Sequence, residues 1–248
     1  MDTPVTALDT LAVFSHPDDA ELTVAGTLLK LKSIGYRTGV LDMTRGEMGT
    51  RGTPEIRARE AHNAAGLLKV DVRLNLDQPD GHVWPTEEAR MAMVRVIREY
   101  KPKVIFTSHW DDPHPDHANT SRITREAARL ASMCRYDEEA GQAAVAVPIV
   151  AYAVYSRLVA PSFIVDVSEF WEEKMNAIRA HASQFYNSNS GEPETRISSP
   201  GFLQQIEWRM RYYGSLIGST AGEAFYVREA LNVDDPLALL TRPMNIYS

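Results

Sequence analysis

The chain has 248 residues, with 26 basic and 33 acidic side chains and a formal net charge of −7 at pH 7. This length permits one α/β domain with a full-sized hydrophobic core, and the acidic balance argues against binding to nucleic-acid phosphates. The single cysteine, Cys134, excludes an internal disulfide.

The first half of the chain alternates between apolar, β-rich runs and amphipathic stretches. Gly35 ends the first amphipathic stretch, Thr53 with Pro54 opens the second, and Thr86 caps the third. Strands are expected at 10–15, 37–43, 70–76 and 104–108, and helices at 21–34, 53–68, 86–100 and 118–133. This alternation predicts an α/β, doubly wound fold, with a parallel sheet, right-handed crossovers and helices on both faces.

The second half of the chain continues the pattern less regularly. Strands are expected at 149–156 and 163–166, and helices at 168–184 and 199–213. Residues 187–200, which are rich in Ser, Asn, Gly and Pro, form a loop that is either a plain connector, which we prefer, or a mobile wall of the site. No segment resembles an interdomain linker, so residues 1–248 are expected to form a single domain in which 142–248 complete the site.

Membrane insertion and secretion are disfavoured by the sequence. The longest apolar run, 143–154, is interrupted by Pro148 and is shorter than the roughly 20 residues that span a bilayer. Residues 1–10 lack the basic and apolar regions of a secretion signal. We therefore expect a cytoplasmic protein with no membrane partner.

Two polar motifs follow the first and fourth expected strands. The first strand runs into His16-Pro-Asp-Asp19, and the fourth runs into residues 109–117, which contain three histidines and three aspartates. In open α/β sheets, ligands bind outside the carboxyl ends of the strands, at the point where the strand order reverses. For the common order 3-2-1-4-5, that point lies between strands 1 and 4. The topology therefore brings the two motifs together.

Imidazole and carboxylate groups are usual ligands of catalytic zinc, which keeps three protein ligands and leaves one position for water. His16, Asp19 and His117 could supply such a set, and the pair His114 and His117 has the same spacing as His16 and Asp19. Sequence spacing does not select among these ligands. Either motif alone is better explained as a helix cap or an ordinary polar loop, but two such motifs at adjacent strand ends favour a metal site.

Other uses of this fold lack their motifs. The first strand-to-helix turn has no G-x-G-x-x-G sequence for a dinucleotide, and no Walker lysine follows a glycine-rich loop. There is no G-x-S-x-G motif for a serine nucleophile, and no histidine is close to Cys134 in the sequence. These alternatives are therefore weaker than a metal site.

The motifs His16-Pro-Asp-Asp-Ala-Glu21 and His114-Pro-Asp-His117 resemble those of the LmbE-like (PIG-L) family of zinc-dependent N-acetylglucosaminide deacetylases. Further segments look like the bacillithiol-biosynthesis deacetylases of that family, namely 44–53, 55–57, Asn75-Leu76, Pro79-Asp80, 183–185 and 223–225. These matches extend over about nine tenths of the chain. The resemblance implies a Rossmann-like α/β layer fold, one Zn²⁺ or another divalent transition metal per chain, and assembly into a homo-oligomer.

Carried over residue by residue, the resemblance makes His16, Asp19 and His117 the metal ligands. It makes Asp18 the general base that deprotonates the metal-bound water. This chemistry has a physical reason, because zinc lowers the pKa of bound water from about 15.7 toward about 7 and also polarises the amide carbonyl. We interpret Glu21 as an acid of the first helical turn, or as a group behind the ligands, rather than as a ligand.

The resemblance also makes His114 the acid or oxyanion partner, oriented by Asp116, and Arg57 a substrate contact. Arg45, Arg51 and Arg57 cluster after the second strand of an acidic protein. Such a cluster suits an anionic substrate, because a guanidinium group binds a carboxylate through paired hydrogen bonds. For Arg45 and Arg51, a solvated surface role is an equal alternative.

The resulting hypothesis is hydrolysis of N-acetylglucosaminyl malate to glucosaminyl malate and acetate in bacillithiol biosynthesis. Two alternatives remain hydrolytic, namely another N-acylglucosaminide or the amide of a thiol conjugate. A different class, a non-catalytic carbohydrate- or nucleotide-binding protein, would need neither Asp18 nor a metal. The expected partner is a small-molecule glycoside. His62, His82 and His181 have no partner motif and are expected to be structural.

Overall fold

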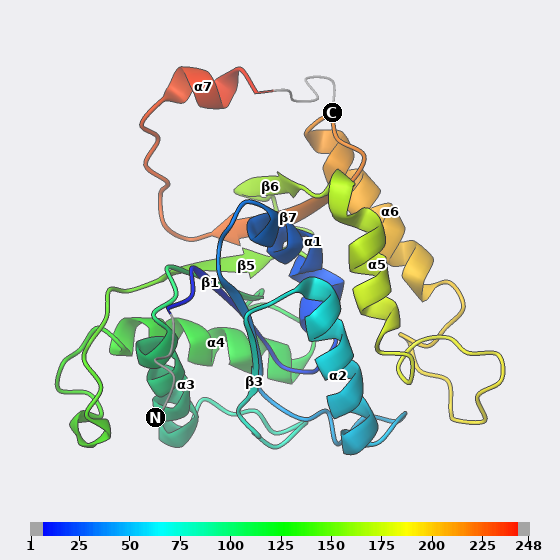
Figure 1. The fold of residues 1–248 in the computed structure, drawn as a ribbon, viewed down its shortest axis with the longest axis horizontal. Coiled ribbons are helices and arrows are strands. Elements are labelled where there is room, and N and C mark those ends of the chain that lie inside the picture. Colours follow the sequence, from blue (N-terminus) through cyan, green and yellow to red (C-terminus); the bar gives the residue numbers. More distant parts are fainter. Residues whose placement is uncertain (1–6, 243–248) are drawn as a thin grey trace.

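A seven-stranded mixed sheet forms the centre of the computed structural model, which describes residues 7–242 (Figure 1). Its strand order is β3-β2-β1-β4-β5-β7-β6. The strands are β1 (Thr10–Phe14), β2 (Thr38–Asp42), β3 (Val72–Asn75), β4 (Val104–Ser108), β5 (Ile149–Ala153), β6 (Phe163–Asp166) and β7 (Gly222–Val227). The first five strands pair in parallel, which confirms the predicted order 3-2-1-4-5.

Helices cover both faces of this sheet, as the alternating sequence pattern predicts (Figure 1). The helices are α1 (Asp19–Ser33), α2 (Pro54–Leu68), α3 (Glu87–Tyr100), α4 (Pro115–Leu130), α5 (Trp171–Arg179), α6 (Phe202–Leu216) and α7 (Pro236–Leu240). Leu11 and Val13 of β1 belong to the apolar cluster with α3 and α4, whereas Ala12 and Phe14 belong to the cluster with α1. Because both faces are covered, β1 is buried throughout and reads as one continuous apolar run.

Strand β7 makes the sheet mixed, whereas the sequence predicts a parallel sheet. It lies between β5 and β6 and runs antiparallel to both. Its Glu223 interrupts the apolar pattern, yet the side chain is buried and accepts hydrogen bonds from the backbone N–H groups of Gly26 and Thr27. The same carboxylate pairs with the buried Lys174 ammonium at 2.6 Å. A buried, paired Glu223 thus stands where an apolar side chain would be expected. For this reason the hydrophobicity pattern of the sequence does not predict β7.

Three helices differ by three or more residues from their predicted boundaries, and one of them, expected at 199–213, is α6 at Phe202–Leu216. The helix expected at 118–133 begins at Pro115, because the His114 side chain caps it by accepting the Asp116 N–H at 3.2 Å. The helix expected at 168–184 is a 3₁₀ turn over Ser168–Phe170 followed by α5. Residues 187–200 contain neither helix nor strand, which confirms the predicted loop.

The loops after β1 and β4 lie side by side at the carboxyl ends of these strands. Strand β1 pairs with β2 on one edge and with β4 on the other, so the strand order reverses between β1 and β4. Helix α1 begins just after the first loop, and α4 begins after the second. The predicted convergence of the two motifs is therefore confirmed. Within residues 7–242, no helix is long and apolar enough to cross a membrane.

Candidate metal centre

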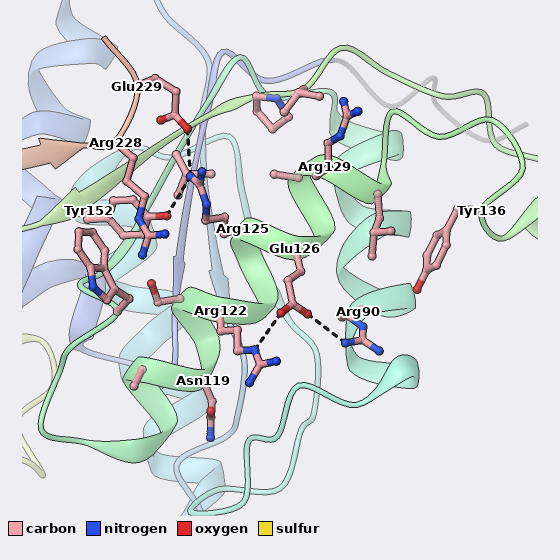
Figure 2. Close-up of a pocket in the computed structure, with 18 of the residues that line it drawn as sticks. Arg90, Asn119, Arg122, Arg125, Glu126, Arg129, Tyr136, Tyr152, Arg228 and Glu229 are labelled. Carbon is pink, nitrogen blue, oxygen red and sulfur yellow. Dashed lines mark hydrogen bonds and ion pairs between the residues drawn. The ribbon is translucent and has the colours of Figure 1, made fainter. Parts of the chain in front are cut away.

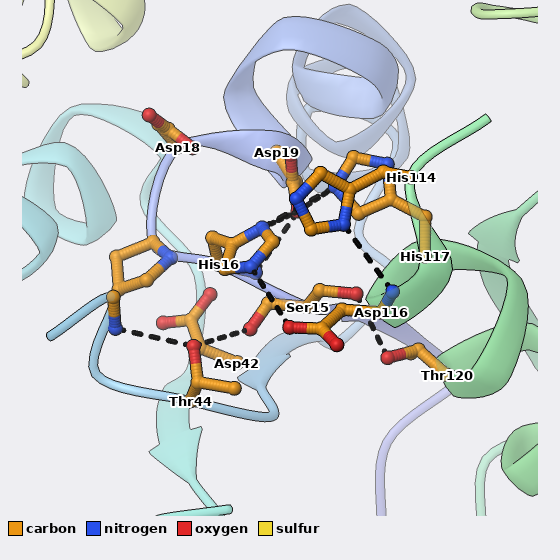
Figure 3. Close-up of polar contacts among 12 residues, drawn as sticks. Ser15, His16, Asp18, Asp19, Asp42, Thr44, His114, Asp116, His117 and Thr120 are labelled. Carbon is orange, nitrogen blue, oxygen red and sulfur yellow. Dashed lines mark hydrogen bonds and ion pairs between the residues drawn. The ribbon is translucent and has the colours of Figure 1, made fainter. Parts of the chain in front are cut away.

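Three side chains from the two loops converge on one point (Figure 3). His16 follows β1, Asp19 begins α1, and His117 lies in the first turn of α4. Asp19 Oδ2 lies 3.3 Å from His16 Nδ1 and 3.2 Å from His117 Nε2. These two imidazole nitrogens are 3.3 Å apart, so the three atoms form a nearly equilateral triangle.

The triangle has the dimensions of a zinc site. Zinc binds imidazole nitrogen at about 2.0–2.1 Å in tetrahedral geometry, which separates neighbouring ligand atoms by about 3.3–3.4 Å. The observed separations of 3.2 and 3.3 Å match this spacing. Two imidazoles and one carboxylate also form the protein ligand set of known catalytic zinc sites. The residues present therefore fit zinc or a similar divalent ion.

The remote nitrogen of each imidazole contacts a further carboxylate. His16 Nε2 lies 3.0 Å from Asp80 Oδ1 and 3.5 Å from Asp116 Oδ2. His117 Nδ1 lies 3.2 Å from Asp112 Oδ1. Such carboxylates hold the imidazole proton on the remote nitrogen, which leaves the other lone pair directed into the triangle, as in metal-ligating histidines.

Sequence reasoning did not single out Asp80 or Asp112. Asp80 belongs to a Gln-Pro-Asp-Gly segment that reads as a turn, and its reach to His16 depends on the pairing of β3 beside β2. Asp112 lies inside the polar segment 109–117, where nothing in the spacing separates it from its acidic neighbours. One signal was present for Asp80, because Pro79-Asp80 is among the segments that resemble the bacillithiol-biosynthesis deacetylases.

The electrostatics of the triangle favour a positive charge. Burial alone would raise the pKa of Asp19, but His117 and His16 outweigh burial and hold that pKa well below its usual range. Burial alone would lower the pKa of His117, but Asp19 and Asp112 raise it to about 9. The carboxylates therefore stabilise cationic charge between these side chains, whether protons or a metal ion carry it.

Asp18 lies beside the triangle but outside it (Figure 3). Its φ of 130° is rare for a residue other than glycine, and such strain costs on the order of 1–3 kcal/mol. Its carboxylate is buried, with Oδ2 3.6 Å from Arg57 Nη2. Burial raises the pKa of Asp18 to about 6, and Arg57 limits the rise. The fold thus holds a second carboxylate, one residue before Asp19 and separate from the three ligand atoms, in a strained backbone conformation.

His114 stacks on His117, with ring centroids 4.7 Å apart. Its Nδ1 accepts the Asp116 N–H, so the neutral ring carries its proton on Nε2. Burial and the neighbouring His117 lower the pKa of His114, which favours this neutral form. His114, His16 and Asp116 also form a second group of closely spaced ligand-type atoms, so the alternative left open by the sequence spacing has a structural counterpart.

Asp116 supports the site in a different way from the one expected. Its carboxylate accepts hydrogen bonds from the N–H groups of Gly81 at 2.7 Å and Val83 at 3.2 Å, and it faces His16. Its contact with His114 is made by the backbone N–H instead. Asp116 therefore joins the loop after β3 to the two histidines.

Arg57 is buried behind the loop that carries Asp18. Its Nη1 donates to the Gly46 carbonyl at 2.9 Å and its Nη2 donates to the Pro17 carbonyl at 2.8 Å. Gly46 has a φ of +68°, and a Cβ there would overlap the Arg57 guanidinium. Position 46 therefore requires glycine. The Arg57 guanidinium fixes the loop between His16 and Asp19 through its hydrogen bond to the Pro17 carbonyl.

Arg45 and Arg51 are also engaged by groups of this chain. The exposed Arg45 pairs with Asp77 at 2.5 Å. The buried Arg51 donates from Nε to the Ser183 carbonyl at 3.0 Å and lies 3.7 Å from Glu192, in the loop before α6. Arg45 thus belongs to an exposed ion pair and Arg51 ties two loops together, and a substrate contact by either arginine stays a prediction.

The other histidines named from the sequence, and Glu21, lie outside the triangle of ligands. His62 and His82 are exposed. His181 and Glu21 are fully buried and lie 3.4 Å apart, and Glu21 also pairs with Arg73 at 2.5 Å. Burial would raise the pKa of Glu21, but Arg73 and His181 lower it to about 2. Glu21 is thus a charged group behind the ligand loop, outside the triangle.

Several known proteins are similar to this chain. The family model for GlcNAc-PI de-N-acetylase (PIG-L) matches residues 11–128, which contain both motifs. Diacetylchitobiose deacetylase of Thermococcus kodakarensis is 30% identical over 71% of this chain and 69% of its own. Probable N-acetyl-alpha-D-glucosaminyl L-malate deacetylase 2 of Bacillus anthracis is 28% identical over 81% of this chain and 91% of its own. The solved structure of the conserved protein TT1542 from Thermus thermophilus has a TM-score of 0.82 and 35% identity, over 91% of this chain and 97% of its own.

Proposed function

Because this chain belongs to the GlcNAc-PI de-N-acetylase (PIG-L) family, we propose that it is a metal-dependent hydrolase that removes the acetyl group from the nitrogen of an N-acetylglucosaminide. The observation that carries the proposal is the triangle of His16, Asp19 and His117 at the strand-order reversal. Water is added across the amide C–N bond, and the products are acetate and a free amine. The whole chain would act as one catalytic domain.

His16, Asp19 and His117 would hold one divalent transition-metal ion per chain, with zinc as the first choice. When bound, such an ion acts as a Lewis acid toward the amide carbonyl and lowers the pKa of water. The chain's own part is to fix the three ligands, which it does through Asp80 on His16 and Asp112 on His117. Rigid ligands keep the position of the scissile amide constant from one turnover to the next.

Asp18 is the proposed general base. The Asp18 carboxylate is not one of the three ligand groups of the triangle. Asp18 follows His16 by two residues, and the surrounding loop holds it in a strained backbone conformation. Asp18 would take the proton of the attacking water. Arg57 would position this loop through the Pro17 carbonyl, in addition to the substrate contact that the family resemblance implies.

His114 is the proposed acid or oxyanion partner. Its Nδ1 is occupied by the Asp116 N–H, so its Nε2–H is the group left to donate toward a developing negative charge. A donor that is already oriented costs no reorganisation when the charge forms. Asp116 would set this orientation through its backbone.

We propose N-acetylglucosaminyl malate as the first substrate to test, with glucosaminyl malate and acetate as products of a step in bacillithiol biosynthesis. The similarity to the Bacillus anthracis protein, which extends over 91% of that protein, supports this aglycone. In this role the enzyme would work in the cytoplasm as a homo-oligomer on a small-molecule glycoside.

The engaged arginines favour a second candidate, a neutral disaccharide such as diacetylchitobiose. Malate carboxylates would have to displace Asp77 from Arg45, or the Ser183 carbonyl from Arg51. A neutral sugar has no such requirement. The similarity to the Thermococcus kodakarensis diacetylchitobiose deacetylase points to the same substrate class.

Acetate release from three substrates tests these proposals. The panel is N-acetylglucosaminyl malate, diacetylchitobiose and methyl N-acetylglucosaminide, each measured with zinc-loaded and metal-stripped protein. One charge-assisted contact to malate is worth about 1.5–3 kcal/mol, so a malate enzyme should prefer that substrate over the methyl glycoside by at least about tenfold in kcat/KM. Equal values would overturn the malate proposal and leave the deacetylase intact. No acetate from any substrate would overturn the deacetylase and favour a binding protein.

A further inference from the structure

A basic groove runs along α4, and none of the three ligand residues lines it (Figure 2). It has a cavity volume of about 1220 Å³. Five arginines line it, namely Arg90, Arg122, Arg125, Arg129 and Arg228. Its apolar wall includes Leu130, Val147 and Pro148. The groove therefore offers both guanidinium groups and apolar surface.

The positive charge of the groove is only partly neutralised by its own acids. Glu126 lies between Arg90 and Arg122, at 3.0 and 2.8 Å (Figure 2). Glu229 pairs with Arg125 at 3.1 Å. With Glu87 as the third acid, the lining keeps a surplus of two positive charges in a chain whose net charge is −7. A local surplus of this kind selects for a partner with negative charge.

The segment 230–241, which we call the C-terminal arm, leaves the body of the protein at the edge of this groove. Figure 1 shows it extending away from the sheet and carrying α7 at its far end. Every residue of the arm is exposed. Leu231, Leu237 and Leu240 are 55%, 72% and 67% exposed. Side-chain hydrogen bonds of the arm, such as the Asp235 cap on α7, stay within the arm.

An arm of this composition needs a surface to pack against. An isolated helix shorter than about 12 residues is marginal in water, and α7 has five residues. Exposed leucines on one short segment also lose the stabilisation that burial would give them. The arm contains Asp234 and Asp235, and Arg242 follows it directly, so the segment combines a net negative charge with apolar side chains.

We propose that the C-terminal arm of one copy docks into the basic groove of a second copy of this chain. The arm carries two carboxylates and leucines and keeps a net negative charge with Arg242 included, and the groove carries two surplus positive charges and an apolar wall. Because Arg228 and Glu229 line the groove, the arm begins at its edge. Two copies related by a two-fold axis, groove toward groove, would each place an arm over the partner's groove. This exchange does not rest on the proposed function, because it involves neither the ligands nor Asp18.

Light scattering coupled to gel filtration tests the exchange in the full chain. The expected mass is at least twice the 27.7 kDa of one chain. A chain that ends at Glu229, and separately the exposed double variant Arg129→Glu with Arg228→Glu, should each lose at least half of the assembled mass. Leu158→Asp is the matched control, because Leu158 is 85% exposed and belongs to neither surface. A full chain of single-copy mass, or an assembly that survives the truncation, would overturn the proposal.

A mixing experiment distinguishes exchange between copies from docking within one copy. The chain that ends at Glu229 keeps its groove but has no arm, and the double arginine variant keeps its arm but has a damaged groove. When mixed, these two should form a mixed pair held by one arm in one groove, detected through an affinity tag on one of them. Failure to pair, with thermal unfolding of both variants like that of the parent, would show that the arm does not serve a second copy.

Discussion

The substitution Asp80→Asn tests whether the carboxylates behind the two histidines hold the metal centre together. Asp80 Oδ1 lies 3.0 Å from His16 Nε2, and its Oδ2 accepts the Met48 N–H at 2.8 Å. An asparagine amide has one acceptor and one donor group, so it can satisfy only one of these two N–H groups. The asparagine must then present its NH₂ group to the other N–H group. His16 therefore loses either this hydrogen-bond acceptor or its present orientation.

The expected cost follows from the role of such contacts in metal sites. Removing the partner of a ligating histidine lowers metal affinity by about 10–100-fold, which corresponds to about 1.4–2.7 kcal/mol. Asp112→Asn is the matched comparison, because Asp112 Oδ1 alone receives both His117 Nδ1 at 3.2 Å and the His114 N–H at 2.9 Å. One amide oxygen can keep both contacts, so we expect a smaller loss, about tenfold or less.

Competition with a zinc-binding dye at pH 7 measures these affinities. Asp77→Asn is the control, because Asp77 pairs with the exposed Arg45 and belongs to the same loop region. It should bind zinc like the parent protein. Thermal unfolding of the metal-free proteins checks that the variants are folded. Parental zinc affinity in folded Asp80→Asn would show that the Asp80 carboxylate does not hold His16 in place for the metal.

Four other substitutions have distinct expected outcomes. Asp18→Asn and His114→Ala should each lower kcat by about 100-fold or more at unchanged metal content, because neither side chain belongs to the triangle; loss of metal in Asp18→Asn would exchange its role with that of Asp19. Gly46→Ala should lower kcat by displacing Arg57, whereas Gly35→Ala, which also has a positive φ but open space, should leave kcat unchanged. Lys174→Met should lower the Tm by roughly 10 °C, because breaking a buried ion pair costs about 3–5 kcal/mol, and Lys32→Met, at a partly exposed pair, should change it by no more than a few degrees.

The parts of the fold that were predictable from the sequence rest on local patterns. Strands β1 and β4 are mainly apolar because both of their faces are covered, and a polar motif follows each of them. Parallel pairing then places His16 and His117 at one edge of the sheet, whatever the details of the loops. Convergence of these residues was therefore predictable before any side-chain position was known.

The parts that were not predictable depend on contacts between distant segments. Glu223 reads as a polar residue until its partner Lys174 is known, so β7 was not recognised as a strand. Asp80 reads as a turn residue until β3 is placed beside β2. Arg51 belongs to a basic cluster in the sequence, but its partner is the Ser183 carbonyl, far along the chain. In each case the role of the residue is set by its partner, which no local pattern encodes.

Acetate release measured against metal occupancy tests whether this chain is a metal-dependent deacetylase. Protein stripped with a chelator would be titrated with zinc, and the bound metal of each sample would be determined by elemental analysis. We expect acetate release to rise in proportion to occupancy and to saturate at one ion per chain, and we expect His117→Ala to stay inactive throughout. Full acetate release by protein without measurable metal would contradict this expectation.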